Sequence, residues 1–180
     1  GGYLSYENIA DKATVAGVEI EIRKNLFVRP VSNAAHGMNK LSLGLNGSYI
    51  YTNAKMPLAT VTTGSQLEGA APWIVNFDLS HNFTKGERSF VNTLVLNYVS
   101  DKIYTIGTQG YQDIMEQGVL TLDFVSQAKL NKHLSLNLKA RNLLNPSYKL
   151  SRKANENGEK VILNDYKKGI NISLGVSCTF

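Results

Sequence analysis

The most constraining feature of this sequence is the strict alternation of its last eleven residues. Apolar side chains occupy every second position, with small or polar residues between them: Ile170, Ile172, Leu174, Val176, Cys178 and Phe180. Because successive side chains of a strand point to opposite faces, this stretch predicts a β-strand with one apolar face. Ten steps of about 3.3 Å, tilted by about 40°, rise roughly 25 Å, which matches the apolar band of an outer-membrane barrel. Strands of soluble sandwiches are usually about half as long, so the pattern favours a membrane-spanning strand.

The composition agrees with this interpretation. No run of eighteen apolar residues is present that could form a transmembrane helix. The mean hydropathy is slightly negative, which a barrel tolerates because half of its strand residues face a wet interior. Charged residues make up only 18% of the chain, below the roughly 25% of a soluble domain. Asn, Ser, Thr and Gly supply much of the polarity instead, as expected for a hydrated strand wall.

The same alternation recurs along the whole chain and predicts an all-β, antiparallel transmembrane β-barrel with about eight strands. Strands are expected over residues 1–7, 13–24, 41–52, 73–83, 89–102, 118–129, 134–140 and 170–180. Short turns are expected at 84–88 and 130–133, and long connections at 25–40, 53–71, 104–117 and 151–168. Outer-membrane barrels alternate short periplasmic turns with long extracellular loops in this way. By parity, the connection at 25–40 falls on the short-turn side despite its expected length. Pro146 predicts a bulge or a strand end, because proline donates no ladder hydrogen bond.

Charged residues indicate which face of each strand is wet. In the strand at 13–24, one face carries three charges while the other carries Val18, Ile20 and Ile22. An Arg or Lys at the bilayer midplane costs about 2–4 kcal/mol, so the charged face is expected to line the lumen. The predicted lumen-facing charges are Glu19, Glu21, Arg23, Asp78, Asp123, Lys139 and Arg141. They are interpreted as a cross-strand charge lattice, with packing against a plug as the alternative.

Two further assignments concern the lipid-facing side. For the strand at 89–102 the outward residues are expected to be Phe90, Leu94, Leu96 and Tyr98. Either choice of face leaves one asparagine on the lipid side. The aromatic residues Tyr49, Tyr51, Trp73 and Phe83 are expected to belong to the girdles at the two membrane interfaces.

No catalytic, cofactor or metal site is predicted. The three histidines, His36, His81 and His133, do not converge with a carboxylate in the expected strand arrangement. Cys178 is the only cysteine, which excludes a disulfide framework, and its place in the apolar alternation suits a small hydrophobic residue. The net charge of +5 is scattered among turns and loops and shows no nucleic-acid-binding pattern.

Four stretches together resemble the carboxy-terminal barrel half of TonB-dependent outer-membrane receptors. Residues 12–21, KATVAGVEIE, are similar to the "A…GvElE" strand of that family. Residues 97–103, NYVSDKI, resemble its "NYvGdRi" segment, with Ser100 and Lys102 in place of the usual Gly and Arg. Residues 140–148, ARNLLNPSY, resemble its "v.NLln..Y" element, and Phe180 is similar to the terminal aromatic of its assembly signal.

This resemblance implies a 22-stranded barrel, closed by an amino-terminal plug, in the outer membrane of a Gram-negative bacterium. Such receptors import a scarce nutrient, of the siderophore, vitamin or oligosaccharide class, with energy relayed by TonB through the plug. It further implies contact with outer-membrane lipid and recognition of the C-terminal strand by the barrel-assembly machinery. Residues 1–180 would then be the C-terminal part of the barrel domain, without the plug.

Two alternatives remain open at this point. The chain could be a complete eight-stranded outer-membrane barrel with a structural or adhesive role, for which 180 residues is a natural size. It could also be a soluble, lipocalin-like ligand-binding barrel, whose apolar face would have to lie inside. The location of the apolar side chains discriminates between the membrane and soluble possibilities.

Overall fold

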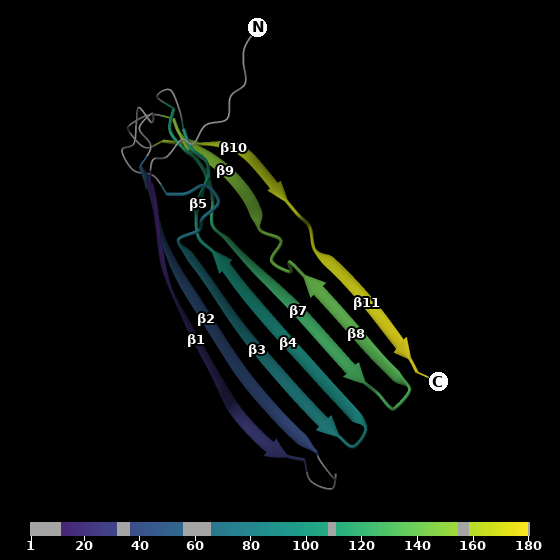
Figure 1. The fold of residues 1–180 in the computed structure, drawn as a ribbon. Coiled ribbons are helices and arrows are strands. Elements are labelled where there is room, and N and C mark those ends of the chain that lie inside the picture. Colours follow the sequence, from purple (N-terminus) through teal and green to yellow (C-terminus); the bar gives the residue numbers. More distant parts are fainter. Residues whose placement is uncertain (1–11, 32–36, 56–65, 108–110, 155–158, 180) are drawn as a thin grey trace.

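The computed structural model describes residues 12–31, 37–55, 66–107, 111–154 and 159–179. Within them every strand pair is antiparallel. Seven strands form one sheet in the order β1-β2-β3-β4-β7-β8-β11 (Figure 1). They are β1 (Lys12–Pro30), β2 (Met38–Lys55), β3 (Trp73–Lys85), β4 (Arg88–Val99), β7 (Val119–Lys129), β8 (Leu134–Arg141) and β11 (Asn171–Cys178). The described residues include no helix long and apolar enough to span a membrane.

A second, four-stranded sheet continues four of these strands. It contains β5 (Lys102–Thr105), β6 (Ile114–Glu116), β9 (Ser147–Lys153) and β10 (Lys160–Lys167), in the order β10-β9-β6-β5. This order repeats that of β11, β8, β7 and β4 in the main sheet. The chain therefore forms one long antiparallel ribbon that is interrupted at corresponding places in four neighbouring strands.

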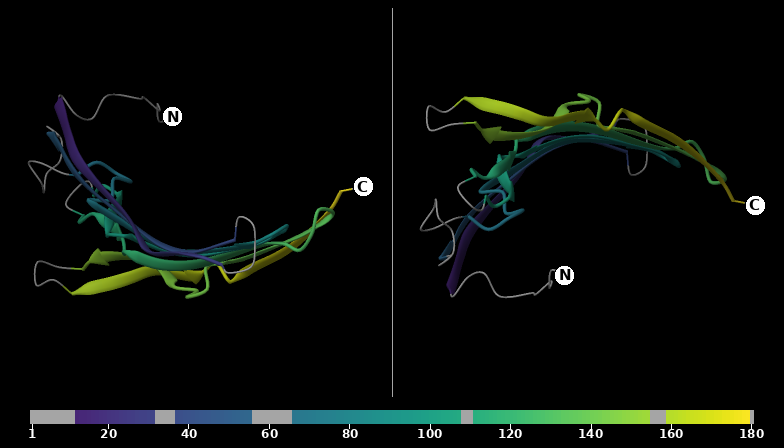
Figure 2. Two further views of the ribbon diagram at one scale, coloured as in Figure 1. Left: turned by 90° about the horizontal axis from the view of Figure 1, so that it is seen from below. Right: turned by 90° about the horizontal axis from the view of Figure 1, so that it is seen from above.

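The main sheet is a shallow arc with two free edges. Its outer strands β1 and β11 lie far apart and do not pair with each other (Figure 2). There is no compact core, because the described residues include no large side chain that is fully buried. Ile172 and Leu174 are 68% and 71% exposed, although both lie in a regular strand. Apolar side chains thus cover an open face of the sheet instead of filling an interior.

The register divides the main sheet into two chemically different faces. Opposed residues in neighbouring strands share a face, so a row such as Leu45, Phe77, Leu96 and Leu122 lies on one side. We call this side the apolar face; the opposite side, which carries Glu19, Asn76 and Asp123, is the polar face. Phe90, Leu94, Leu96 and Tyr98 lie on the apolar face, as predicted for this strand.

Most strand predictions are confirmed, and three of the four connections are corrected. The seven expected strands that fall in the described part correspond to the seven strands of the main sheet. Strand structure continues into 25–40, because β1 extends to Pro30 and β2 begins at Met38. Val31 N donates to Gly37 O at 3.1 Å just beyond the two strands. The connection is therefore much shorter than expected, and the exception to the alternation of short and long connections disappears.

The expected loops at 104–117 and 151–168 were wrong in a similar way, because they contain β6, the end of β9 and β10. These strands pair mainly with one another in the second sheet. Alternation within a single segment does not predict this pairing. β11 is also shorter than expected, running from Asn171 to Cys178. The expected strand at 1–7 and most of the connection at 53–71 lie outside the described residues, as does Phe180.

A β-bulge in β1 changes which residues face each side. The register shifts between Asn25 and Phe27, so that Leu26 is the extra residue. Lys24 opposes Leu43 before the bulge and Phe27 opposes Leu41 after it, which places both on the apolar face. Arg29, opposite Asn39, lies on that face too. The alternation in the sequence beyond Asn25 therefore cannot be read with the parity of the preceding residues.

Candidate functional site

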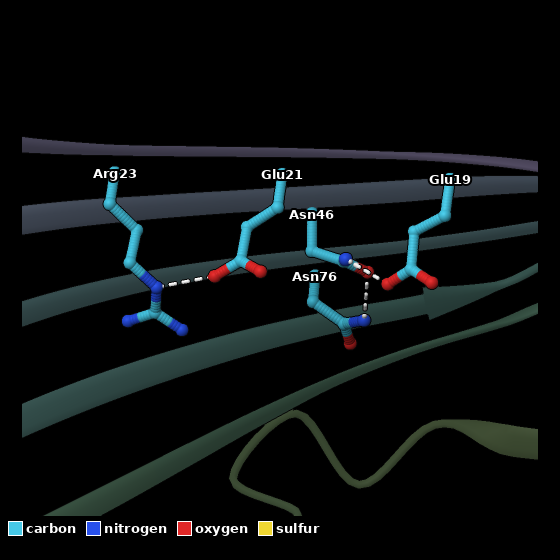
Figure 3. Close-up of polar contacts among 5 residues, drawn as sticks. All are labelled: Glu19, Glu21, Arg23, Asn46 and Asn76. Atoms are coloured by element: carbon cyan, nitrogen blue, oxygen red, sulfur yellow. Dashed lines mark hydrogen bonds and ion pairs between the residues drawn. The ribbon is translucent and has the colours of Figure 1, made fainter.

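The polar face of the sheet is held together by a chain of side-chain amides. Asn46 Nδ2 donates to Glu19 Oε1 at 2.6 Å, and Asn76 Nδ2 donates to Asn46 Oδ1 at 3.3 Å (Figure 3). Asn97 Nδ2 in turn donates to Asn76 Oδ1. All three amides point in one direction, toward the carboxylate of Glu19. The chain of amides thus links four neighbouring strands, from Glu19 in β1 to Asn97 in β4.

The seven predicted charges all lie on this polar face, but they are not joined into one lattice. Glu21 and Arg23 form an ion pair within β1, between side chains that are 51% and 73% exposed (Figure 3). Asp123 accepts a hydrogen bond at 2.8 Å from the backbone N–H of Asn142. The register places Lys139 opposite Ser173 and Arg141 opposite Asn171. Within the described strands of the main sheet, Glu19 is therefore joined to the neighbouring strands by the side-chain amides of Asn46 and Asn76 and not by another charged residue.

Gly44 allows a carboxylate to lie flat across the sheet. It stands between Arg23 of β1 and Asp78 of β3 in one cross-strand row. A Cβ at this position would collide with the carboxylate of Asp78, so the missing side chain leaves room for Asp78 to lean toward β1. The same row continues through Val95 to Asp123, and two carboxylates therefore flank Val95.

Residues of two of the family-like stretches, NYVSDKI at 97–103 and ARNLLNPSY at 140–148, form the hydrogen bonds at the interruption between the two sheets. In the NYVSDKI stretch, Ser100 Oγ accepts from Trp73 N at 3.0 Å and Asp101 Oδ1 accepts from Gly118 N at 2.6 Å. Where the ladder is broken, backbone N–H groups require other acceptors. The side chains of Ser100 and Asp101 supply them, which gives these two residues a definite structural role.

The ARNLLNPSY stretch performs the same task for β8 and β11. Asn142 Nδ2 donates to Gly169 O at 2.7 Å, and Asn145 Oδ1 accepts from Gly169 N at 3.1 Å. Both asparagines have positive φ, 58° for Asn142 and 43° for Asn145, a conformation that Asn tolerates better than most residues. Pro146 correctly predicted the break, but the link from both asparagines to Gly169 depends on a distant segment of the chain.

A polar pocket of about 320 Å³ lies where the two sheets meet. Its lining includes Asn97, Lys102, Glu116, Gln117, Tyr148 and Lys168. Lys102 and Glu116 form an ion pair at 3.3 Å, and the ammonium of Lys168 lies 3.9 Å from the ring centroid of Tyr148. The pocket thus offers amide, ammonium and carboxylate groups beside an aromatic ring, and it suits a hydrogen-bonding ligand.

Tyr148 is the aromatic residue of this pocket, and the local sequence does not single it out. Of the nearby tyrosines, Tyr104 and Tyr111 are exposed, and the ring centroid of Tyr111 lies 5.4 Å from the guanidinium carbon of Arg152. Tyr148 stacks on Tyr166 at 5.5 Å. The register of β9 and β10 places these two rings opposite each other, so their stacking depends on strand pairing.

The histidines do not form a site with carboxylates. His81 Nε2 lies 2.8 Å from Asn39 Oδ1, and His133 Nδ1 lies 2.7 Å from Thr179 O. His36 lies outside the described residues. In the described part of the chain, no group of three or more His, Cys, Asp or Glu side chains could hold a metal ion. Cys178 is a free, exposed cysteine on the apolar face.

Comparison with known proteins identifies the family. No curated protein and no solved structure matches this chain. A family model described as TonB dependent receptor-like, beta-barrel, matches residues 1–143, which is most of the chain. The match includes the strand with Glu19 and Glu21, the amide chain and the NYVSDKI stretch. The strand pattern, the two-faced sheet and this match together show that the chain belongs to the TonB dependent receptor-like β-barrel family.

Proposed function

We propose that this chain forms part of the wall of an outer-membrane receptor that imports a scarce nutrient with energy relayed by TonB. The observation that carries the proposal is the two-faced sheet. Large apolar side chains stand exposed on one face, while a hydrogen-bonded chain of amides and charges covers the other. A soluble protein rarely exposes so extensive an apolar surface, whereas a membrane barrel requires one facing lipid.

In this proposal the polar face lines the lumen. The predicted lumen-facing residues, Glu19 and Glu21 among them, would then contact water and the plug of the parent receptor. The charges on this face support the assignment, because the interior of such a barrel is polar whereas its outer band is apolar. The amide chain would keep the carboxylate of Glu19 in a fixed position on the wall, whichever partner it meets there.

We further propose that residues 1–180 belong to a barrel larger than eight strands. Strands β1 and β11 are unpaired on their outer edges within the described part. Open edges do not occur in hydrocarbon, because unpaired backbone groups there cost several kcal/mol each. Seven strands of an eight-stranded barrel would nearly close the circle, yet the observed arc is shallow (Figure 2). The curvature favours the 22-stranded barrel over the complete eight-stranded barrel with an adhesive role.

The C-terminal strand has the features of an assembly signal. Its apolar side chains, Ile172, Leu174, Val176 and Cys178, oppose Ala140, Leu138, Leu136 and Leu134 of β8 on the apolar face. We propose that this strand, with Ile170 before it and Phe180 at its end, is recognised by the barrel-assembly machinery. The outer edge of β11 offers the unpaired backbone groups that such recognition by strand addition uses.

The pocket between the two sheets is our candidate for a nutrient-contacting surface. Its mixture of amide, ammonium, carboxylate and tyrosine groups fits a siderophore, a vitamin or an oligosaccharide. Transport, and not catalysis, is the activity proposed for it. The pocket lies at the end of the sheet where the long connections lie, which is the extracellular end in this family of barrels.

An uptake experiment tests this function. A strain lacking the full-length protein is complemented with it, and the uptake of labelled ferric siderophores, cobalamin and oligosaccharides is measured with and without a proton uncoupler. We expect uptake of one class that stops when the uncoupler is added. Lys168→Ala should reduce this uptake, whereas Lys160→Ala, on the same hairpin, should not.

Two outcomes would contradict the proposal. Recovery of the protein in the soluble periplasm without detergent would refute a membrane barrel. Correct insertion in the outer membrane without energy-dependent uptake of any class would instead favour the structural or adhesive role.

A further inference from the structure

The apolar face carries a group of polar residues that the proposed transport function does not explain. They occupy two adjacent cross-strand rows: His81, Asn92 and Ser126 lie in one, and Arg29 and Asn39 lie in the next. His81 Nε2 and Asn39 Oδ1, in different rows, are 2.8 Å apart, and Ser126 Oγ donates to Asn92 Oδ1 at 2.7 Å. We call these five residues the polar belt. It crosses the sheet in the half nearer the short turns.

Polar groups on a lipid-facing surface are costly unless they find hydrogen-bond partners. The belt meets part of this requirement internally, through the two bonds that join its members in pairs. Both bonds use the amide oxygens of the asparagines. Within the described part of the chain neither Nδ2 group of Asn39 and Asn92 donates a hydrogen bond, so two N–H donor groups on this face lack an acceptor. A ligand that offers acceptor oxygens would satisfy them.

Charge on the apolar face has one sign. Among the described strands of the main sheet, no carboxylate lies on this face, whereas the polar face carries both signs. The cations of the apolar face gather in the half with the short turns: Lys24, Arg29, Lys85 and Arg88. Lys12 and Lys55, which oppose each other in the register, lie at the opposite end. The half with the belt therefore attracts anions.

Aromatic rings lie between these polar groups. Phe83 and Phe90 form a pair with centroids 6.4 Å apart, between the belt residues His81 and Asn92 and the cations Lys85 and Arg88. The guanidinium of Arg29 lies 5.6 Å from the centroid of the Phe27 ring. On the other side of the belt the face is formed by leucines such as Leu79 and Leu94. Along β3 and β4 the order is thus a leucine, a polar residue, a phenylalanine and a cation. Asn39 and Arg29 lie in the same cross-strand row as the two phenylalanine rings.

We propose that the polar belt and its adjoining cations bind an anionic phospholipid of the leaflet at the short-turn end. The leucines contact the acyl chains, and the amide donors of Asn39 and Asn92 reach the ester carbonyl oxygens. Arg29, Lys85 and Arg88 hold the phosphate, since long basic side chains extend along a surface to reach a charged head group. The chemistry recognised is one phosphate with ester oxygens nearby, and two acyl chains distinguish this ligand from free phosphate.

Lipid binding to the purified full-length protein tests this site. Native mass spectrometry measures the retention of dioctanoyl phosphatidylglycerol, dioctanoyl phosphatidylcholine and inorganic phosphate. We expect phosphatidylglycerol to bind and the other two to bind far more weakly. Each basic residue near a membrane surface contributes about fivefold in affinity, so Arg29→Gln with Arg88→Gln should weaken binding roughly 25-fold.

The control variant is Lys12→Gln, which removes a cation from the same face at the opposite end and should leave binding unchanged. His81→Leu removes the hydrogen bond between His81 and Asn39 but keeps the positive charge of Arg29. This variant should also weaken lipid binding. Each variant is first shown to be folded by its heat-modifiable band on a gel. Uptake is measured separately, so a failure of lipid binding does not depend on the transport proposal.

Three results would overturn the inference. The first is equal retention of phosphatidylglycerol and phosphatidylcholine. The second is binding of inorganic phosphate as strong as that of the lipid, which would indicate a simple anion site. The third is a second protein molecule on the belt, revealed by a dimer that Arg29→Gln with Arg88→Gln dissociates.

Discussion

A pair of arginine substitutions at adjacent positions of β4 tests the assignment of the two faces. Leu94 lies on the apolar face, opposite Leu79 and Phe124 and midway between Phe90 and Tyr98. Val95 lies on the polar face, in the row between Asp78 and Asp123. The two positions share the same strand and depth, so the comparison isolates the side of the sheet on which the new charge lies.

The two substitutions are expected to change the free energy of unfolding by different amounts and for different reasons. Leu94→Arg places a charge near the bilayer midplane, which lowers the free energy of unfolding by about 2–4 kcal/mol. Val95→Arg places the charge between two carboxylates in a hydrated interior, where such pairs change stability by about 0.2–1 kcal/mol in the favourable direction. The difference of about 3 kcal/mol corresponds to more than a hundredfold change in the ratio of folded to unfolded protein.

The full-length protein is folded into phosphatidylcholine bilayers and titrated with urea, and the folded fraction is read from the heat-modifiable band. We expect the urea midpoint of Leu94→Arg to fall markedly and that of Val95→Arg to stay near the parent value. Equal losses for the two variants, or a greater loss for Val95→Arg, would refute the reasoning that the apolar face meets lipid.

Three further predictions concern the interruption and the amide chain. Gly118→Ala should lower the free energy of unfolding by about 1–3 kcal/mol, because its Cβ would lie 2.9 Å from Val99 O and 3.1 Å from Asp101 N. Gly47→Ala, with no atom within 4 Å of its Cβ, is the urea-titration control, and equal effects would contradict the steric argument. Asn142→Ala should cost more than Asn142→Gly by about 1–2 kcal/mol, because Asn142 has φ of 58° and only glycine adopts this conformation freely; identical urea midpoints would show that the backbone conformation contributes nothing. Asn76→Ala should remove about 1 kcal/mol by breaking the chain between Asn46 and Asn97, and a double-mutant cycle with Asn97→Ala should be non-additive, whereas strict additivity would show that the bonds act independently.

The alternation of the chain was enough to predict the main sheet. In a strand every second side chain points to the same face, so the alternation of apolar and polar residues is a local property. The strands around Ile20, Phe77 and Leu174 could therefore be assigned from their own residues. The charges of the polar face follow from the same rule, since Glu19 and Asp123 each lie between apolar neighbours. For the same reason the facing of β4 was correct despite its asparagines.

Departures from regular alternation limited the prediction. Pro30 and Gly37 favoured a connection at 25–40, and the extra residue Leu26 reverses the parity in β1, so the alternation of the preceding residues does not continue there. β6 is only three residues long, and with β9 and β10 it depends on pairing with segments far away in the chain. The pocket with Tyr148 and Lys168 exists only because these strands meet, so no local pattern could indicate it.

By itself the sequence determined that this chain forms antiparallel strands with one apolar and one polar face, because the direction of a side chain is set within its own strand. Only the tertiary structure decided which residues of different strands oppose one another. That register brings Asn46, Asn76 and Asn97 into one chain and gathers Arg29 and His81 into one belt. Cross-strand neighbours are set by pairing between distant segments, and the register also specifies the curvature that leaves the sheet open.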